Sequence, residues 1–492
     1  MQPLITLAEA IGFSAEQIKN PNLPITDIAY NSKNAAEGVL FVCLIGAVTD
    51  GHRYAADAYL RGSRVFVAEK DLSLPEDAVV LKVENTRRAL ALLSAEFFGH
   101  PEKKIKIIGV TGTKGKSTIA EMIRHILSEN GIPAASVGTV GVRIGDVMTA
   151  TANTTPESYE LFRIFADIEK KGIRHAVIEV SSQGVKLDRI YGIPFHTAVM
   201  TNLSEDHIGD AEHPTFEDYK ACKKELFHRT ENAVFNADDD YFEEFISVAT
   251  VPSYTYSTRE QADFTAKAIS PIMTENGFAT SFILESMTAK TEVILPFPGE
   301  FSVSNALAAI TVARLLGIDE EKAAEALSTA TVKGRFERIH TPLVGVTFVI
   351  DYAHNGESLS AALRALRAYA PNRLICLFGS VGGRTEIRRR ELGIAAAEYA
   401  DFSILTEDNP DRENSADIIR DIERHMNGAP HIAISDRKEA IEYAVSMAKE
   451  GDIILFAGKG HENYQLIDGK KIPFSEKELI LAAADKISIS KI

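Results

Sequence analysis

A glycine-rich loop with the composition of a phosphate-binding loop spans residues 109–117, Gly-Val-Thr-Gly-Thr-Lys-Gly-Lys-Ser. It follows an apolar run and precedes a helical pattern that starts at Ser117. Such a loop turns successive backbone N–H groups toward phosphate oxygens, and the positive end of the following helix favours the same charge. Lys116 would reach the β- and γ-phosphates, and the Ser117 hydroxyl would bind Mg²⁺. The strict GxxxxGK[ST] pattern is not met, because Val110 stands where it requires glycine, so a glycine-rich helix cap is the alternative.

A lysine with unusual surroundings is predicted in the segment Pro214–Arg229. The segment opens with a capping box, Thr215 to Asp218, and carries apolar residues at helical spacing. Lys223 falls on this apolar stripe, whereas the lysines beside it point elsewhere. Burial lowers the pKa of a lysine, and the neutral amine can react with CO₂ to give a carbamate, a hard oxygen ligand suited to Mg²⁺. The alternative is a lysine that lays its stem along the core and keeps its ammonium in water.

Two further residues follow apolar strands in the same region. Glu179 ends the run Ala176–Ile178, and His207 comes shortly after the strand Thr197–Met200. A carboxylate oxygen and an imidazole nitrogen are both metal ligands, although each residue alone is more often structural.

The elements that must position these residues alternate between strands and helices from about residue 104 to 330, which is typical of a parallel α/β sheet. After about residue 332 the strand–loop–helix pattern continues, with strands predicted at Thr347–Ile350, Leu374–Phe378, Phe402–Leu405 and Ile453–Ala457. Polar or glycine-rich residues follow each strand, at the sheet edge where ligands of α/β proteins bind. The polar segment His100–Lys104 is predicted to be a joint between domains.

Composition limits the functional classes. The chain has 492 residues, and its 53 basic and 69 acidic residues give a formal net charge of −16. That length suggests about three domains. The acidic balance argues against nucleic acid or an anionic membrane as a partner. Three distant cysteines give no disulfide or zinc framework. The first residues lack the features of a secretory leader and no apolar run is long enough to span a bilayer, so we expect a cytoplasmic protein.

Eight motifs occur together in a fixed order and carry a family resemblance. They are TGTKGKS, NTTP (153–156), EVSSQG (179–184), TNLSEDH (201–207), the YxxxK of Tyr219–Lys223, DYAHN (351–355), DNP (408–410) and GKGHE (458–462). Together with the N-terminal segment, they make the chain similar to the Mur ligases over almost its whole length, and most similar to the branch that builds the UDP-linked tripeptide of peptidoglycan.

The resemblance implies an α/β protein of three domains. Residues 1–98 would bind the UDP-sugar, residues 99–331 would form a central P-loop ATPase domain, and residues 332–492 would form a Rossmann-like domain for the incoming amino acid. The implied reaction is ATP-dependent amide formation on UDP-MurNAc-L-Ala-D-Glu through an acyl phosphate, with a free diamino acid as second substrate. We expect a monomer.

The resemblance also implies roles for individual residues. The catalytic set is Lys116, Glu179, His207 and Lys223. ATP would be bound by Gly112, Thr113, Gly115, Lys116, Ser117, Thr118, Asn305 and Asp351. The metal Mg²⁺ would be held by Ser117, Glu179, His207 and carbamylated Lys223. The UDP-linked substrate would contact Ser32, helped by Asp50–His52, and also Asn153, Thr154, Thr155, Ser181 and Arg189. The amino acid would contact Arg384, Asp408, Asn409, Asp411, Gly458 and Glu462.

The residue after DNP predicts the choice of amino acid. Relatives that use meso-diaminopimelate carry DNPR, whose arginine pairs with the distal carboxylate of that substrate. Here Asp411 takes that place and arginine is displaced to Arg412. A carboxylate would repel diaminopimelate and attract an ammonium, so the sequence predicts L-lysine or ornithine. The alternatives are that Arg412 turns into the pocket, that Asp411 is solvated and the substrate is meso-diaminopimelate, or that the chain is a folate-polyglutamating relative or a non-catalytic scaffold.

Overall fold

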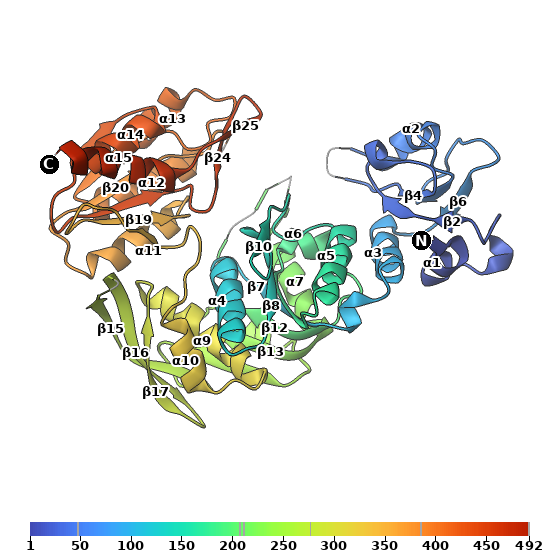
Figure 1. The fold of residues 1–492 in the computed structure, drawn as a ribbon, viewed down its shortest axis with the longest axis horizontal. Helices are drawn as coiled ribbons and strands as arrows, with labels where there is room; N and C mark the ends of the chain where they lie inside the picture. The colour runs from blue at the N-terminus through green and yellow to red at the C-terminus, as the bar shows by residue number, and fades with distance from the viewer. Residues whose placement is uncertain (47–48, 206–207, 210–211, 276, 384–385, 491–492) are drawn as a thin grey trace. The chain divides into compact units, whose positions relative to one another are not determined.

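The computed structural model describes residues 1–46, 49–205, 208–209, 212–275, 277–383 and 386–490 (Figure 1). They form two compact units, Met1–Asp263 with Ala308–Asp319 and Phe264–Leu307 with Glu320–Ile492. Helix α9 (Glu300–Leu315) contributes residues to both units. Helices and strands alternate through much of each unit, as the predicted α/β class requires.

The N-terminal part of the first unit contains a parallel sheet with the strand order β3-β4-β5-β6. Every residue of β4 and β5 is buried, which is typical of parallel strands covered on both faces. The strands are β3 (Asp27–Ala29), β4 (Val39–Val42), β5 (Val65–Ala68) and β6 (Val79–Lys82), with a short pair β1 (Gln2–Pro3) and β2 (Pro24–Ile25). The helices are α1 (Leu4–Ala10), α2 (Ala55–Leu60) and α3 (Thr86–Phe97).

The central part of the first unit is a larger sheet with the order β10-β9-β8-β11-β7-β12-β13-β14. Its strands are β7 (Lys106–Thr111), β8 (Ala134–Gly138), β9 (Gly141–Ile144), β10 (Val147–Thr149), β11 (His175–Glu179), β12 (Phe195–Met200), β13 (Thr230–Asn236) and β14 (Ser253–Ser257). Its helices are α4 (Lys116–Glu129), α5 (Ser158–Lys170), α6 (Ser182–Lys186), α7 (Phe216–Lys224) and α8 (Phe242–Ile246). Because β11, β7 and β12 are parallel neighbours, the segments that follow them emerge at one edge of the sheet.

The strand–helix alternation of a parallel sheet, predicted up to about residue 330, does not continue through residues 264–295. Strands β15 (Phe264–Thr274), β16 (Gly277–Ser286) and β17 (Lys290–Leu295) pair antiparallel, and they are yellow-green in Figure 1. Strands β9 and β10 are antiparallel too. The connections are too short for the crossover that a parallel pair needs.

The second unit also contains a sheet with the order β18-β19-β23-β20-β21-β22, parallel except for β18. Its strands are β18 (Glu337–Ile339), β19 (Thr347–Asp351), β20 (Leu374–Phe378), β21 (Phe402–Leu405), β22 (His431–Ala433) and β23 (Ile453–Ala457), followed by the hairpin β24 (Tyr464–Ile467) and β25 (Lys470–Pro473). Its helices are α10 (Glu320–Leu327), α11 (Gly356–Arg367), α12 (Glu386–Tyr399), α13 (Ser415–Glu423), α14 (Arg437–Ser446) and α15 (Glu476–Ser490). The four strands predicted here are all present.

The predicted joint at His100–Lys104 is a packed turn. Pro101 and Glu102 are buried, and the His100 ring lies 2.8 Å from a Glu102 oxygen and 3.0 Å from one of Glu96. The turn lies inside the first compact unit. The domain boundaries after residues 98 and 331 therefore stay predictions.

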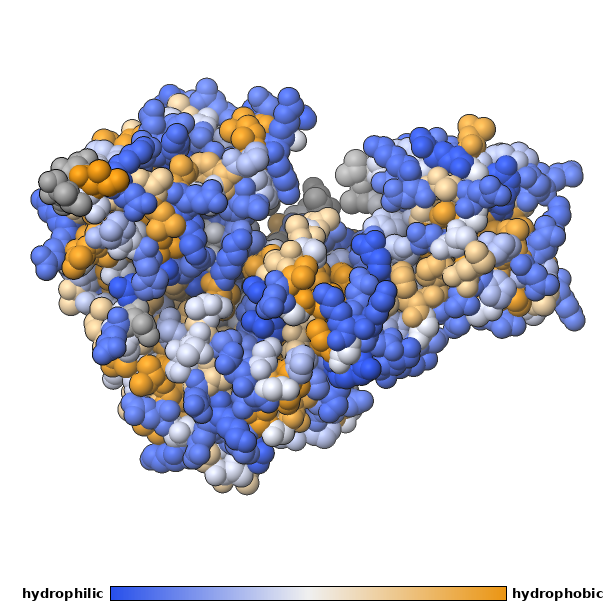
Figure 2. Space-filling view, in the orientation of Figure 1, coloured by the Kyte–Doolittle hydropathy of each residue, from blue (hydrophilic) through white to orange (hydrophobic). Residues whose placement is uncertain are grey.

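Polar residues cover most of the face seen in Figure 2, and hydrophobic residues appear there in scattered spots. Single exposed apolar side chains such as Leu60 and Met287 are ordinary for a globular surface. Among the described residues, no helix combines the length and apolar character needed to cross a membrane.

Candidate active site

The glycine-rich loop is a tight connection between β7 and α4. Gly112 and Gly115 have φ angles of +141° and +86°, a region that favours glycine. A Cβ atom on Gly112 would lie 1.9 Å from the Thr201 hydroxyl, so the loop can approach the end of β12 only with glycine there. The backbone N–H of Ser204 donates to the Thr113 hydroxyl at 3.0 Å. The loop is thus fixed from the segment that follows β12.

Two lysine side chains converge on one backbone oxygen of this loop. The Lys116 ammonium donates to the carbonyls of Gly112 at 2.9 Å and Thr113 at 3.0 Å. The Lys223 ammonium donates to the same Gly112 carbonyl at 2.8 Å and lies 4.4 Å from the centre of the Tyr219 ring. Lys223 is 1% exposed, so the predicted burial of this lysine is confirmed.

Helix α7 explains why Lys223 points inward. The Thr215 side chain accepts the N–H of Asp218 and caps the helix, while the Asp218 carboxylate binds Lys186 and His213, so one half of the predicted capping box is present. The ammonium groups of Lys220 and Lys224 lie 3.0 and 2.5 Å from carboxylate oxygens of Glu244, on another face. Beyond residue 224 the chain tightens into a 3₁₀ turn up to residue 229, so the regular helix is shorter than its apolar stripe.

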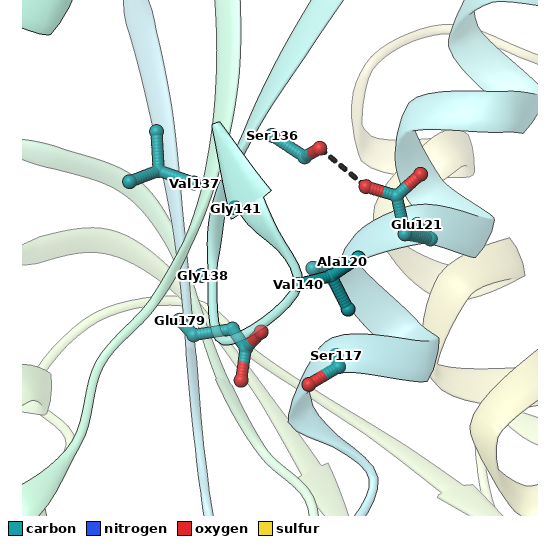
Figure 3. Close-up of a pocket in the computed structure, with 9 residues that line it drawn as sticks. All are labelled: Ser117, Ala120, Glu121, Ser136, Val137, Gly138, Val140, Gly141 and Glu179. Atoms are coloured by element: carbon teal, nitrogen blue, oxygen red, sulfur yellow. Dashed lines mark hydrogen bonds between the residues drawn. The ribbon is translucent and has the colours of Figure 1, made fainter. Parts of the chain in front are cut away.

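Glu179 and Ser117 line one small pocket between α4 and the strands β8, β9 and β11, and Figure 3 shows both polar groups facing it. Glu179 is 3% exposed, and it accepts the backbone N–H of Thr139 at 2.9 Å and the hydroxyl of Thr139 at 3.2 Å. A Cβ atom on Gly138 would lie 2.0 Å from Glu179 Oε1, so glycine makes room for the carboxylate. A carboxylate and a hydroxyl are hard oxygen donors that fit Mg²⁺. The predicted ligand His207 lies outside the described residues.

The residues predicted to hold the UDP-linked substrate lie around the backbone of Glu179. The Thr155 hydroxyl donates to the Glu179 carbonyl at 2.9 Å and accepts the N–H of Ser181 at 2.9 Å. Arg189 donates from Nη1 to the Thr155 carbonyl at 2.9 Å. The Thr154 hydroxyl is linked to Thr139, and Asn153 is exposed beside it. The structure therefore brings this predicted set together.

Ser32 lies in a 3₁₀ turn of the N-terminal part and is 8% exposed. Its hydrogen bond is the main cause of the lowered pKa of Asp57. The nearby His52 ring lies 2.6 Å from an oxygen of Asp50 and accepts the N–H of Glu69 at 3.0 Å. Both ring nitrogens of His52 therefore have partners within the protein, and the predicted contact of Asp50–His52 with the substrate stays a prediction.

A second cluster of predicted residues forms in the second unit, at the carboxyl ends of β21 and β23. Asn409 donates from its amide to Glu462 at 2.9 Å. Lys459, which is fully buried, lies between them, with its ammonium 2.6 Å from Asn409 Oδ1, 3.1 Å from Glu462 Oε2 and 3.4 Å from Asp408 Oδ1. Lys459 is not among the predicted site residues, although its position beside Gly458 after a buried strand was a usable signal.

Asp411 does not act as a charge aimed into a pocket. Its φ angle is +52°, its N–H donates to Leu466 at 2.9 Å, and its Oδ1 accepts the N–H of Gly469 at 2.6 Å. This carboxylate closes the turn between β24 and β25. Arg412 is exposed, and Arg384 lies outside the described residues.

Two residues predicted to contact ATP belong to the second unit. Asn305 is 9% exposed on α9. Asp351 ends β19, and its Oδ2 accepts the N–H of Phe336 at 2.9 Å. Burial raises the pKa of Asp351, and the Arg335 guanidinium opposes that rise.

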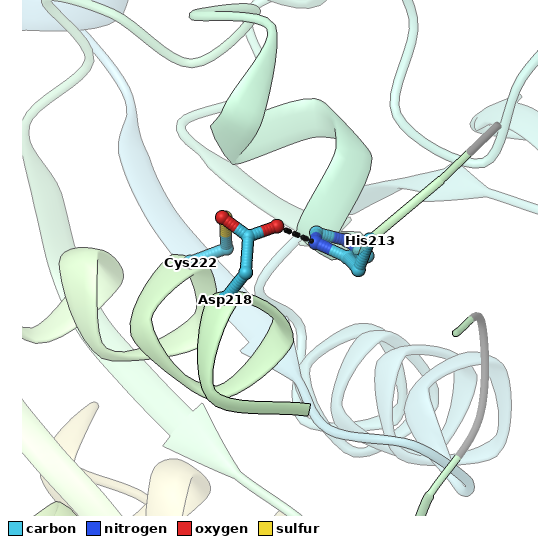
Figure 4. A group of neighbouring side chains, drawn as sticks. All are labelled: His213, Asp218 and Cys222. Atoms are coloured by element: carbon cyan, nitrogen blue, oxygen red, sulfur yellow. Dashed lines mark hydrogen bonds and ion pairs between the residues drawn. The ribbon is translucent and has the colours of Figure 1, made fainter. Parts of the chain in front are cut away.

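His213 is a buried residue that the sequence analysis missed (Figure 4). Its Nδ1 lies 2.7 Å from Asp218 Oδ2 and its Nε2 lies 2.9 Å from the Ser182 hydroxyl, while the Lys186 ammonium lies 2.8 Å from the same Asp218 oxygen. Burial raises the pKa of the neighbouring Cys222 thiol to about 11. Because the imidazole, carboxylate and ammonium already satisfy one another, we interpret this group as a link between α6, which follows Glu179, and α7, which carries Lys223.

Comparison with known proteins decides the family. Residues 110–313 match the Mur ligase middle domain, and residues 334–460 match the Mur ligase glutamate ligase domain. The chain belongs to the Mur ligase family. This Mur ligase is 40% identical over 473 residues to the UDP-N-acetylmuramoyl-L-alanyl-D-glutamate–2,6-diaminopimelate ligase of Caldanaerobacter subterraneus. The aligned region covers 95% of this chain and 97% of that protein. It is 37% identical over 477 residues to the enzyme of the same name from Clostridium perfringens, with 95% and 97% covered.

A solved structure of a ligase with that name is also similar. It has a TM-score of 0.71 and 28% sequence identity, and the match covers 98% of this Mur ligase and 99% of that chain. The family confirms the predicted three-domain α/β architecture and the class of ATP-dependent, amide-forming ligases. It does not support the prediction of L-lysine, because the similar proteins are named for 2,6-diaminopimelate. The position of Asp411 gives the physical reason: its carboxylate is bound within a turn.

Proposed function

We propose that this Mur ligase joins meso-diaminopimelate to UDP-N-acetylmuramoyl-L-alanyl-D-glutamate with hydrolysis of ATP to ADP and phosphate, in peptidoglycan synthesis. The observation that supports this most is the convergence of Lys116 and Lys223 on the Gly112 carbonyl. One loop would thus hold the phosphates of ATP and face the buried residues around Glu179. ATP and the UDP-linked substrate would place the reaction in the cytoplasm. The monomeric state stays a prediction.

The chemistry we propose has two steps. An oxygen of the glutamyl carboxylate attacks the γ-phosphorus of ATP, and ADP leaves. The free amine of diaminopimelate then attacks the acyl phosphate carbon, and phosphate leaves as the amide forms. Such reactions depend on positioning and on the stabilisation of charge, which Lys116 would supply at the phosphates and Arg189 at the substrate.

Mg²⁺ would be held by Ser117, Glu179, His207 and a carbamate formed on Lys223, and when bound it would neutralise negative charge on the phosphates. Among the described residues, the buried carboxylate of Glu179 and the hydroxyl of Ser117 in one pocket fit this ion. Lys223 is 1% exposed, and a carbamate at this buried position would supply hard oxygen donors to Mg²⁺.

The cluster of Asp408, Asn409 and Glu462 would bind the amino acid, with Gly458 and Arg384 as further contacts. Asp408 is 3% exposed; its Oδ1 lies 3.4 Å from the Lys459 ammonium but accepts no hydrogen bond among the described residues. A buried acceptor of this kind suits a substrate ammonium group. Asp411 adds no charge selection, so a distal carboxylate on the substrate is compatible with the site.

The test is phosphate release by the purified enzyme with ATP, Mg²⁺ and UDP-N-acetylmuramoyl-L-alanyl-D-glutamate, with meso-diaminopimelate, L-lysine or L-ornithine added one at a time. We expect release that requires the UDP-linked substrate and is fastest with meso-diaminopimelate. Release that is independent of the UDP-linked substrate would contradict the proposal.

A further inference from the structure

Arg437 is one of the largest fully buried side chains among the described residues, although its sequence context, Ser-Asp-Arg-Lys-Glu, is typical of a solvated helix start. It is the first residue of α14, whose cap is formed by the Asp436 side chain. A guanidinium cannot shed its charge, so complete burial requires a full set of acceptors.

The acceptors of Arg437 are two backbone carbonyls and one carboxylate. Nη1 donates to the Glu407 carbonyl at 3.0 Å, and Nη2 donates to the Ala457 carbonyl at 2.8 Å. Nε donates to Glu476 Oε1 at 2.8 Å. Glu476, on α15, is 3% exposed, so the ion pair is buried on both sides.

The two carbonyls belong to the residues directly before Asp408 and Gly458. Glu407 follows β21, and Ala457 is the last residue of β23. These two strands are not neighbours, because β20 lies between them. Arg437 therefore reaches across the end of β20 and fixes the spacing of the two segments on either side. The segment beyond β20 is close by: a Cβ atom on Gly379 would lie 2.2 Å from the Thr406 carbonyl.

The charges of this region form one group. Burial raises the pKa of Glu476, Arg437 and Lys459 oppose the rise, and Asp408 adds to it. Lys459 in turn lies against Asp408, Asn409 and Glu462. The geometry of the predicted amino-acid contacts thus depends on two buried cations, Lys459 and Arg437. Lys459 contacts the predicted site residues directly, whereas Arg437 binds two backbone carbonyls and Glu476.

We propose that Arg437 is a positioning residue for the amino-acid site, which sets the distance between the segments that carry Asp408 and Gly458. This rests on the proposed function, because that function assigns those two residues to the incoming amino acid. A planar fork with several donors can hold two carbonyls and a carboxylate at once, and a lysine ammonium at the same place lacks that fixed geometry. The role is therefore specific to arginine.

The test compares R437K with R420K, a matched change at an arginine that is 60% exposed and pairs with Asp417 at 2.8 Å. Steady-state kinetics would give KM for the amino acid, for ATP and for the UDP-linked substrate, and thermal unfolding would report folding. For folded R437K we expect KM for the amino acid to rise about tenfold or more, since a displacement near 1 Å has effects of that size. KM for ATP and the UDP-linked substrate should stay within about twofold, and R420K should match the wild type.

An unchanged KM for the amino acid in folded R437K, or an equal rise in all three KM values, would overturn the proposal. If R437K does not fold, E476Q decides, because it removes the carboxylate charge that orients the guanidinium and so loosens its hold on the two carbonyls. A selective rise in KM for the amino acid then supports positioning, and an unchanged KM overturns it. The amino-acid preference of the wild type tests the proposed function separately from the role of Arg437. If the wild type uses another amino acid, the KM for that amino acid is compared between wild type and variant. In that case the assignment of meso-diaminopimelate is wrong, and the proposal for Arg437 is still tested.

Discussion

The two predicted sites hold their lysine side chains in different ways. In the first unit, Lys116 and Lys223 both donate to the Gly112 carbonyl of the glycine-rich loop. In the second unit, Lys459 contacts the side chains of Asn409 and Glu462, which come from separate segments. In the first site the shared acceptor is set by the local path of one loop. In the second site the position of Lys459 depends on both Asn409 and Glu462. We therefore expect changes in the first site to act on kcat, and changes in the second to act on KM for the amino acid.

The largest effect is expected for K223A. Loss of the proposed carbamate should lower kcat by about 10²-fold or more, which is typical when a group that stabilises transition-state charge is removed. Short carboxylates added to the assay should restore part of the activity. The measurement is kcat at saturating substrates.

K224A is the matched control, because Lys224 is the next residue and binds Glu244 on another face. Its activity should be close to that of the wild type. Full activity in K223A would exclude the carbamate hypothesis.

K459M should raise KM for the amino acid by about 10- to 100-fold, because it leaves the buried carboxylate of Asp408 and the partly buried carboxylate of Glu462 without their cation. KM for ATP should change little. K471M, at a lysine whose ammonium lies 4.1 Å from the centre of the Tyr464 ring on the exposed hairpin, is the control. A fall in kcat with KM unchanged would remove the proposed difference between the two sites.

H213Q tests whether α6 and α7 are linked through a side chain. It removes the imidazole that is hydrogen-bonded to both Ser182 and Asp218. The free energy of unfolding should fall by about 1–3 kcal/mol, the cost of leaving buried polar groups unsatisfied. Denaturant unfolding checks this, and kcat should fall with it while KM for the amino acid stays constant. Wild-type stability in H213Q would show that the link is dispensable.

The smallest effect is expected for D411A. It removes the carboxylate that accepts the Gly469 N–H, and should lower the free energy of unfolding by about 0.5–1.5 kcal/mol. The order of preference among diamino acids should be unchanged. A switch of preference in D411A would restore Asp411 as a selector of substrate.

The first site could largely be predicted from the sequence, because its signals are local. The glycines at 112 and 115, Lys116 and Ser117 occupy one loop, and the burial of Lys223 follows from helical spacing within one segment. Glu179 was found because it ends an apolar strand.

The second site was predicted only in part. Asp408, Asn409 and Glu462 belong to recognisable motifs, but Arg437 and Glu476 meet only after the chain has folded, and no spacing in the sequence connects them. The sequence shows a negative charge at Asp411 but not its partner, which is the backbone N–H of Gly469, 58 residues away. The antiparallel strands of residues 264–295 were missed because their apolar runs also suit parallel strands.

The most direct test of the central claim is a competition assay. The enzyme receives ATP, Mg²⁺, UDP-N-acetylmuramoyl-L-alanyl-D-glutamate and equal concentrations of meso-diaminopimelate, L-lysine and L-ornithine, and the mass of the UDP-linked product is measured. We predict a product that carries diaminopimelate. A product that carries lysine or ornithine would contradict the account.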